Sequence, residues 1–313
     1  MFNITRLKVS VIIPVYNAAD YLNISIKSAL KQPQTEELLL IDDRSTDNSL
    51  EICRKWEKDD RRVKVYFNEG TKGAGAARNV GLRNAKYDFI AFLDADDYFL
   101  DGRFDDDNYL FNNNNEIEVV ANSLTIVTSD QKKAHGTNII FEHNNIIGYK
   151  PSYSRITLNN FTNGNSFCIT GLTIKSDVFK KVGYFDESLK QCEDTDLNIR
   201  LILYTKMISG NSIKPVVAYF RHQYNSTNIA TEAVYFRRKA AKKHFKMALD
   251  NNFSSKIKLK FFKNFMEYDY LWLFCKNHRF KKYYKAILLP FFLLRILSIK
   301  DPEYDKERKI YKK

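Results

Sequence analysis

One short stretch, residues 89–97, most constrains how this chain can fold: it reads Phe-Ile-Ala-Phe-Leu-Asp-Ala-Asp-Asp. The apolar half is typical of a strand buried on both faces of a parallel sheet. Three unpaired carboxylates could not remain in that interior, so we expect them at the open end of the strand. There Asp94 and Asp96 would point the same way, with alpha carbons roughly 6 to 7 Å apart. A solvated turn after a strand is the alternative interpretation of an isolated Asp-x-Asp.

Strands and helices alternate along the first hundred residues. Apolar strand patterns at 9–15, 37–41, 63–67 and 89–93 are separated by helical patterns. This spacing predicts an α/β fold with a parallel, doubly wound sheet. Such sheets bind ligands at the carboxyl ends of their strands, where Tyr16-Asn17, Asp42-Asp43 and Asp94–Asp96 fall.

The pattern is less regular after Asp101. We expect a strand at 118–128, a short helix at 176–182, a helix that opens at Glu193-Asp-Thr-Asp, and a strand at 216–220. Residues 129–165 are polar and rich in Asn, and their pattern indicates no particular element.

Positive charge is concentrated in the C-terminal part. The whole chain of 313 residues carries a formal charge of +13, whereas residues 232–313 alone hold 22 Lys and Arg against 8 Asp and Glu. An acidic partner, either nucleic acid or an anionic membrane, is therefore indicated for this part alone. A helical stripe at 257, 261, 265, 268 and 272 and a short apolar segment at 286–299 favour an interfacial element, although a packed core helix is the alternative.

The cysteines and the first residues indicate the compartment. Four widely separated cysteines, Cys53, Cys168, Cys192 and Cys275, form neither a CxxC pair nor a dense framework. The chain does not open with a charged start followed by an apolar run. We therefore expect reduced thiols and a cytoplasmic protein.

Five ordered motifs, at residues 11–17, 40–47, 77–81, 93–97 and 193–197, give the chain a resemblance to a known family. It resembles the family-2 glycosyltransferases of the GT-A fold, which are nucleotide-sugar-dependent, inverting enzymes that build bacterial surface polysaccharides. The similarity runs from about Val9 to Ser226. It implies a GT-A domain at 1–228, with a Rossmann-like, mostly parallel central sheet, and a helical, basic and aromatic extension at 229–313 that could dock on a membrane.

The resemblance also implies how a UDP-sugar donor would be bound. The base would be held by the residues that end the first two strands, namely Pro14, Tyr16, Asn17 and Asp43. A carboxylate such as that of Asp43 can accept the imide N–H of uracil. Arg78 would reach the base or the diphosphate, and Asp94 would bind the ribose. Helix capping by Asp42 or Asp43, and a surface position for Arg78, are the alternatives.

The catalytic roles follow in the same way from the resemblance. Asp96 would hold Mn²⁺ or Mg²⁺, which would neutralise the leaving diphosphate. Asp194 would be the base that removes the proton of the acceptor hydroxyl. The alternative is that Glu193, Asp194 and Asp196 only complement the dipole of their helix.

One position departs from the family pattern. The family often ends its catalytic domain with Arg-x-His, in which the His can complete the metal site. Here Arg221 is followed at once by His222, and Gln223 occupies the usual position. Adjacent residues on a strand face opposite ways, so His222 can be a metal ligand only if the strand has ended.

The resemblance implies a metal-dependent hexosyl- or N-acetylhexosaminyltransferase that acts in capsule, O-antigen or lipopolysaccharide synthesis. We expect its saccharide acceptor to be lipid-linked. We expect it at the inner face of the cell membrane, peripherally bound to anionic lipid and without a nucleic-acid partner. A homodimer through the stripe at 261–272 is a further hypothesis. The rival functions are a nucleotidyltransferase on a similar sheet, whose Gly-rich loop at 70–75 is only a loose match, and a non-enzymatic protein that binds nucleic acid or anionic surfaces.

Overall fold

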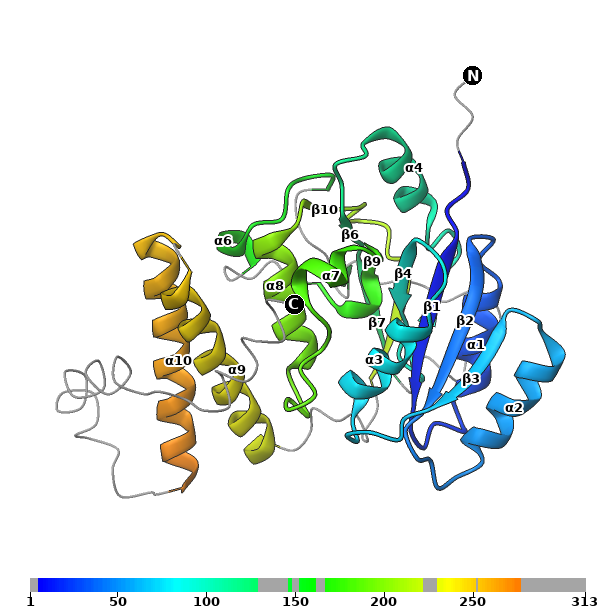
Figure 1. The fold of residues 1–313 in the computed structure, drawn as a ribbon, viewed down its shortest axis with the longest axis horizontal. Helices are drawn as coiled ribbons and strands as arrows, with labels where there is room; N and C mark the ends of the chain where they lie inside the picture. Colours follow the sequence, from blue (N-terminus) through cyan, green and yellow to red (C-terminus); the bar gives the residue numbers. More distant parts are fainter. Residues whose placement is uncertain are drawn as a thin grey trace. The chain divides into compact units, whose positions relative to one another are not determined.

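The computed structural model describes residues 5–128, 146–147, 152–161, 167–221, 230–251 and 253–276. The chain divides into two compact units, Met1–Asn225 and Ser226–Lys313. Figure 1 shows the elements in sequence colours. The GT-A and membrane-docking roles assigned to residues 1–228 and 229–313 stay predictions.

The first unit begins with strands and helices in strict alternation. These elements are β1 (Val9–Val15), α1 (Leu22–Leu30), β2 (Thr35–Asp42), α2 (Ser49–Asp59), β3 (Val63–Phe67), α3 (Ala74–Asn84) and β4 (Phe89–Phe92). Val and Ile fill β1 because the strand is buried on both faces, and α1 packs Leu22, Ile26 and Ala29 from one face into the core. The four predicted strands are all confirmed.

Shorter elements complete the first unit. They are β5 (Tyr98–Phe99), α4 (Asp105–Asn113), β6 (Val119–Ala121), β7 (Leu124–Thr128), β8 (Ile146–Ile147), α6 (Leu158–Phe161), the 3₁₀ turn η2 (Ile169–Gly171), β9 (Leu172–Lys175), α7 (Val178–Val182), α8 (Glu193–Tyr204), β10 (Met207–Ser209) and β11 (Val217–Arg221). The predicted helix that opens at Glu193 and the predicted strand near 216–220 are confirmed.

Seven of the described strands form a central sheet in the order β10-β6-β9-β4-β1-β2-β3 (Figure 1). The pairs β4-β1, β1-β2, β2-β3 and β6-β10 are parallel, whereas β9 runs antiparallel to both of its neighbours. Val15 pairs with Asp42, and Asp42 pairs with Phe67, so three strands reach their carboxyl ends at the same level. The loops that follow them therefore share one edge of the sheet.

A smaller sheet has the order β5-β11-β7-β8. The prediction of a single strand at 118–128 is wrong, because this segment forms two strands in different sheets, β6 in the central sheet and β7 in the smaller one. The chain passes from one sheet to the other at Asn122 and Ser123, where backbone and side-chain groups bind neighbouring segments. The Asn122 backbone N–H donates to the Gly171 carbonyl at 3.0 Å, and Ser123 Oγ lies 2.8 Å from the carbonyls of Asn211 and Lys214.

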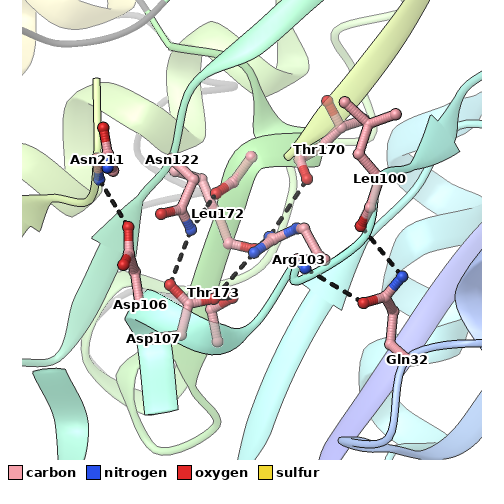
Figure 2. A network of polar contacts seen from close by, with 11 residues as sticks. Gln32, Leu100, Arg103, Asp106, Asp107, Asn122, Thr170, Leu172, Thr173 and Asn211 are labelled. Carbon is pink, nitrogen blue, oxygen red and sulfur yellow. Dashed lines mark hydrogen bonds and ion pairs between the residues drawn. The ribbon is translucent and has the colours of Figure 1, made fainter. Parts of the chain in front are cut away.

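A fully buried ion pair secures this region (Figure 2). Arg103 Nη1 donates to Asp107 Oδ2 at 2.9 Å, and Arg103 Nη2 donates to the Leu172 carbonyl at 2.9 Å. Asp107 also accepts from Asn122 Nδ2 at 2.8 Å and from Thr173 Oγ1 at 2.6 Å. The pair thus ties α4 to the start of β9 and to the break between the two sheets. Charges without solvent are tolerated here because nearly every polar atom has a partner.

The second unit contains α9 (Ala230–Asp250) and α10 (Ser255–Lys276), which pack on each other. The Phe245 ring stacks on Phe265 with centroids 6.3 Å apart and contacts Phe262 at 5.3 Å, and His244 lies against Phe261. Phe261 and Phe265, both 3% exposed, belong to the predicted stripe. Within the described residues no helix is both long and apolar enough to span a membrane. The predicted apolar element at 286–299 lies outside the described residues.

Candidate functional site

The loop after β1 contacts the loop after β2. Tyr16 is 48% exposed, and Asn17 takes a left-handed conformation with φ of 49°. Asn17 Oδ1 accepts the backbone N–H of Thr46 at 2.7 Å, while the Asn17 N–H donates to Ser45 Oγ at 3.2 Å. Pro14 lies half-buried within β1. Asn17 therefore fixes the shape of the loop pair, and Tyr16 presents its ring to solvent beside it.

Two buried aspartates follow β2 and take different partners. Asp42 accepts the backbone N–H groups of Arg44 and Ser45, which closes a tight turn. Asp43 Oδ1 accepts from Asn68 Nδ2 at 2.6 Å, and its Oδ2 accepts the N–H of Gly73 at 2.8 Å. Each carboxylate oxygen has a second lone pair, so Asp43 keeps acceptor capacity.

The Gly-rich loop before α3 brings a cation to the same place. Lys72 Nζ lies 3.7 Å from the centroid of the Tyr16 ring, which is a cation–π contact. Because Gly73 binds Asp43, the loops after β1, β2 and β3 meet around Tyr16 and Asp43. An aromatic face, a carboxylate and an ammonium group are a suitable set for a nucleotide base with its phosphates.

Arg78 lies on α3 with only 5% of its side chain exposed. Its Nη2 donates to Asp94 Oδ1 at 2.6 Å and its Nη1 donates to Glu193 Oε1 at 2.8 Å. Burial lowers the pKa of Arg78, but the negative charges of Asp94 and Glu193 together outweigh it, so the pKa is raised. The surface position considered for Arg78 is therefore wrong, and its direct contact with a diphosphate stays a prediction.

The acidic turn after β4 contains three carboxylates with different surroundings. Asp94 and Asp96 are partly exposed, whereas Asp97 is 1% exposed. Asp97 Oδ1 accepts the backbone N–H of Phe220 at 2.9 Å, which ties the turn to β11 of the small sheet. Burial first, and then the charges of Asp94 and Asp96, raise the pKa of Asp97 well above its ordinary value. The three acids therefore repel one another in a site that is partly shielded from water.

Three acids open α8, and they are not equivalent. Asp194 is partly exposed, and its Oδ1 accepts the N–H of Thr195 at 2.6 Å. Glu193 is buried against Arg78, and burial followed by the charge of Asp194 raises the pKa of Glu193 to about 7. Asp196 is fully buried and pairs with Arg200 at 2.7 Å. Of the three, Asp194 is the one that is partly exposed, and its role as the base stays a prediction.

A thiol and a phenol lie among these carboxylates. Burial raises the pKa of Cys168 to about 12, and the charges of Asp194, Asp97 and Asp94 add to that effect. Burial likewise raises the pKa of Tyr219 to about 12, with further contributions from Asp97 and Asp96. Charge effects of this kind require proximity. Arg78 contacts both Asp94 and Glu193, so the acidic turn and the start of α8 lie next to each other.

Sequence reasoning missed Cys168, Tyr219 and the partnership of Arg78 with Glu193. Tyr219 could have been noticed, because it alternates with the buried Phe220 on a strand that leads to His222. Nothing in the sequence singles out Cys168. His222 itself lies outside the described residues.

The side chains at the acidic turn suit a hard divalent cation. The buried Oδ2 of Asp97 has no hydrogen-bond partner among the described residues. Carboxylate oxygens that repel one another are the ligands Mg²⁺ and Mn²⁺ prefer. Among the described residues, however, no three His, Cys, Asp or Glu side chains are grouped closely enough to form a metal site by themselves. Substrate phosphates would have to supply further ligands.

Comparison with known proteins identifies the family. The family model described as "Glycosyl transferase family 2" matches residues 10–183, which is more than half of the chain. An uncharacterized glycosyltransferase of Haemophilus influenzae is 40% identical over 134 residues, covering 40% of this chain and 54% of that protein. The putative teichuronic acid biosynthesis glycosyltransferase TuaG of Bacillus subtilis is 43% identical over 90 residues, covering 28% of this chain and 36% of that protein.

A longer match is the minor teichoic acid biosynthesis protein GgaA of Bacillus subtilis, 31% identical over 205 residues, which cover 63% of this chain and 44% of that protein. The matched region thus spans about half or less of the length of these curated relatives.

Solved structures show the same fold. TarS 1–349 of S. aureus in complex with UDP-GlcNAc has a TM-score of 0.64 and 22% identity, covering 91% of this chain and 77% of that chain. The mannosyltransferase PcManGT of Pyrobaculum calidifontis, in complex with GDP-Man and Mn²⁺, has a TM-score of 0.51 and 15% identity, covering 85% and 69%. The expected mixed α/β GT-A fold is confirmed. Because the family model matches more than half of its residues, this chain belongs to glycosyl transferase family 2.

Proposed function

We propose that this protein is an inverting glycosyltransferase that moves a sugar from a UDP-sugar to a hydroxyl of a saccharide acceptor during synthesis of a cell-surface polysaccharide. The family assignment supports the reaction class. The names of TuaG and GgaA support the product class, and the UDP-GlcNAc complex of TarS supports the donor class. A hexosyl or N-acetylhexosaminyl group and a lipid-linked acceptor are the finer parts of the proposal.

One observation carries the proposal. Arg78 binds Asp94 of the acidic turn at 2.6 Å and Glu193, the neighbour of Asp194, at 2.8 Å, so a candidate base lies close to a candidate phosphate-binding turn. An inverting transfer needs this arrangement, because the base must approach the anomeric carbon from the side opposite the leaving diphosphate.

Each side chain of the site would have a role that follows from its position. Asp194 would take the proton from the acceptor hydroxyl as its oxygen attacks the anomeric carbon. Pro14, Tyr16, Asn17 and Asp43 would hold the base, and Asp94 would accept a hydrogen bond from the ribose through the oxygen that Arg78 leaves open. Tyr219 keeps its proton at neutral pH and can donate a hydrogen bond into the site.

A divalent cation completes the proposal. Asp96, with His222 as the second expected ligand, would hold Mn²⁺ or Mg²⁺. The cation would supply positive charge beside the diphosphate as it leaves. The Mn²⁺ in the PcManGT complex supports this choice by analogy of fold.

The second unit would place the enzyme at the cytoplasmic face of the membrane. Its surplus of Lys and Arg supports attraction to anionic lipid. Phe261 and Phe265 are buried, so docking or homodimer formation would have to use other side chains of the predicted stripe. Nucleic acid is not part of the proposal.

The deciding experiment is a panel of UDP-sugars incubated with the protein and Mn²⁺, with UDP release measured. Slow hydrolysis of one donor, with release of UDP, would support a glycosyltransferase. Release of pyrophosphate from UTP and a sugar phosphate would instead identify a nucleotidyltransferase. Salt-dependent DNA binding without UDP binding would support the non-enzymatic alternative.

A further inference from the structure

Arg78 bridges the acidic turn after β4 and the start of α8, and the proposed reaction needs these two segments at a fixed distance from each other. We propose that Arg78 is a positioning residue, which through Glu193 fixes the start of α8, and so Asp194, relative to the acidic turn that begins at Asp94. The inference rests on the proposed function, because it takes Asp194 as the base. It differs from a role for Arg78 in binding the diphosphate.

The bridge uses both ends of the guanidinium. Nη2 binds Asp94 at 2.6 Å and Nη1 binds Glu193 at 2.8 Å, and the side chains of Arg78 and Glu193 are only 5% and 11% exposed. Buried, charge-assisted hydrogen bonds of this length are strong and directional. The two carboxylates are therefore held at the spacing that one planar group imposes.

The rest of α3 supports the same contact. Gly75 lies one helical turn before Arg78, and a Cβ at that position would come within 3.0 Å of Glu193 Cγ. Asn79 Nδ2 donates to the Phe185 carbonyl at 2.9 Å, and the Phe185 N–H donates back to Asn79 Oδ1 at 2.9 Å. The Arg78 guanidinium lies 5.4 Å from the centroid of the Phe185 ring. Helix α3 is thus docked on the segment that leads into α8.

Charge explains why an arginine occupies this position. Asp94, Glu193 and Asp194 are acids around one buried cation, and without it they would repel one another. A lysine has a single point of charge and cannot serve two carboxylates with one planar fork. The planar guanidinium of Arg78 satisfies both partners at once from this position on α3.

Loss of the bridge would act on turnover more than on donor affinity. The base-binding groups proposed above, Tyr16 and Asp43, have no contact with Arg78 among the described interactions. Asp94 would keep its charge and its acceptor oxygens when Arg78 is replaced. A shift of about 1 Å in a catalytic group can cost about 10²-fold in rate. Misplacement of Asp194 should therefore lower kcat while UDP affinity changes little.

The test compares the wild-type protein, Arg78→Lys, Glu193→Gln and the double variant. Affinity for UDP with Mn²⁺ is measured by calorimetry, and steady-state hydrolysis of the donor chosen by the panel gives kcat. Arg83→Lys is the matched control, because Arg83 is an exposed arginine on the same helix. We expect Arg78→Lys and Glu193→Gln each to lower kcat by about 10-fold or more, with the UDP Kd within about threefold of wild type. The double variant should be no worse than the poorer single variant, because the two residues act as one unit.

Three results separate the hypotheses. A tenfold or larger loss of UDP affinity in Arg78→Lys, with normal kcat in Glu193→Gln, would overturn the bridge and favour a direct contact with the diphosphate. If Arg78→Lys does not fold, Glu193→Gln alone decides, since an unchanged kcat contradicts the bridge and a kcat-selective loss supports it. A wild-type protein that binds no UDP would refute the proposed function itself, which is a different outcome.

Discussion

Arg78 and Glu193 join at 2.8 Å although 115 residues separate them in the sequence. Pairing with Arg78 lowers the pKa of Glu193, yet burial and the neighbouring Asp194 outweigh it and raise that pKa to about 7. The folded protein therefore holds a proton on Glu193 over a pH range in which the unfolded chain, with an ordinary pKa near 4.5, has released it.

The first prediction concerns the effect of pH on stability. Between pH 4.5 and 7 the folded state binds more protons at Glu193 than the unfolded state, so this group makes the free energy of unfolding fall as pH rises. Glu193→Gln removes that contribution. The free energy of unfolding of the variant, relative to that of wild type, should therefore rise by about 1 to 3 kcal/mol between pH 5 and pH 8. Urea denaturation at both pH values measures the difference. Parallel pH profiles for the two proteins would contradict it. A variant that is more stable at pH 8 yet turns over more slowly would also separate positioning from a merely structural role.

The second prediction concerns the buried pair of Arg103 and Asp107. Asp107→Ala leaves the guanidinium buried without its counter-charge, so the free energy of unfolding should fall by about 3 to 5 kcal/mol. Asp101→Ala is the control, because the side chains of Asp101 and its partner Lys31 are 80% and 69% exposed. Loss of this exposed pair should lower the free energy of unfolding by less than about 1 kcal/mol. Equal losses in the two variants, measured by urea denaturation, would show that burial of the pair does not matter.

The third prediction concerns the metal. Asp96→Ala should lower transfer by about 10²-fold or more and should weaken UDP binding in Mn²⁺, because several kcal/mol of charge stabilisation is lost. The fold should persist. Asp88→Ala is the control, since Asp88 is exposed and directly precedes β4, at the end opposite the acidic turn. Full transfer activity of the wild-type protein in EDTA would refute metal dependence.

The fourth prediction concerns the base. Asp194→Asn keeps the shape of the side chain and its acceptor for Thr195, but it cannot take a proton. Transfer should fall by roughly 10² to 10⁴-fold while the donor still binds. Asp177→Asn, an exposed acid at the start of α7, controls for a simple effect on a helix dipole. Normal transfer by Asp194→Asn would point to Glu193, because Asp196 is fully buried with Arg200.

The regular half of the fold could be predicted because its signal is local. β1 and β4 are runs of apolar residues, and α1 shows its buried face at helical spacing, so each element is readable in its own sequence window. The break at Asn122 and Ser123 could not be read in this way. Strand-forming residues stand on both sides of Asn122 and Ser123, and the bonds that these two residues make with distant segments decide where the chain changes sheets.

The sequence predicts where the site residues lie in the fold but not which hydrogen bonds they form with one another. The carboxyl ends of parallel strands meet at one edge, which places Tyr16, Asp43 and Asp94 together from sequence alone. Hydrogen bonds across long separations are a property of the folded chain. The bond from Phe220 to Asp97 crosses 123 residues, and no pattern within either segment indicates it.

The last prediction concerns the second unit and membranes. Lys256 and Lys263 are exposed on α10, and reversing both to Glu should weaken binding to phosphatidylserine vesicles about tenfold or more, because each basic residue near an anionic surface contributes about 1 kcal/mol. Lys55→Glu with Lys58→Glu, on the exposed side of α2, changes the net charge equally and should have little effect. Vesicle co-sedimentation at low and high salt measures both variants.

Binding that falls equally in both variants would mean that only the total charge matters. A wild-type chain that does not bind anionic vesicles would remove the membrane from the proposed function. Because Phe261 and Phe265 are buried, we expect most of the binding by the described helices to be electrostatic and therefore reversed by salt.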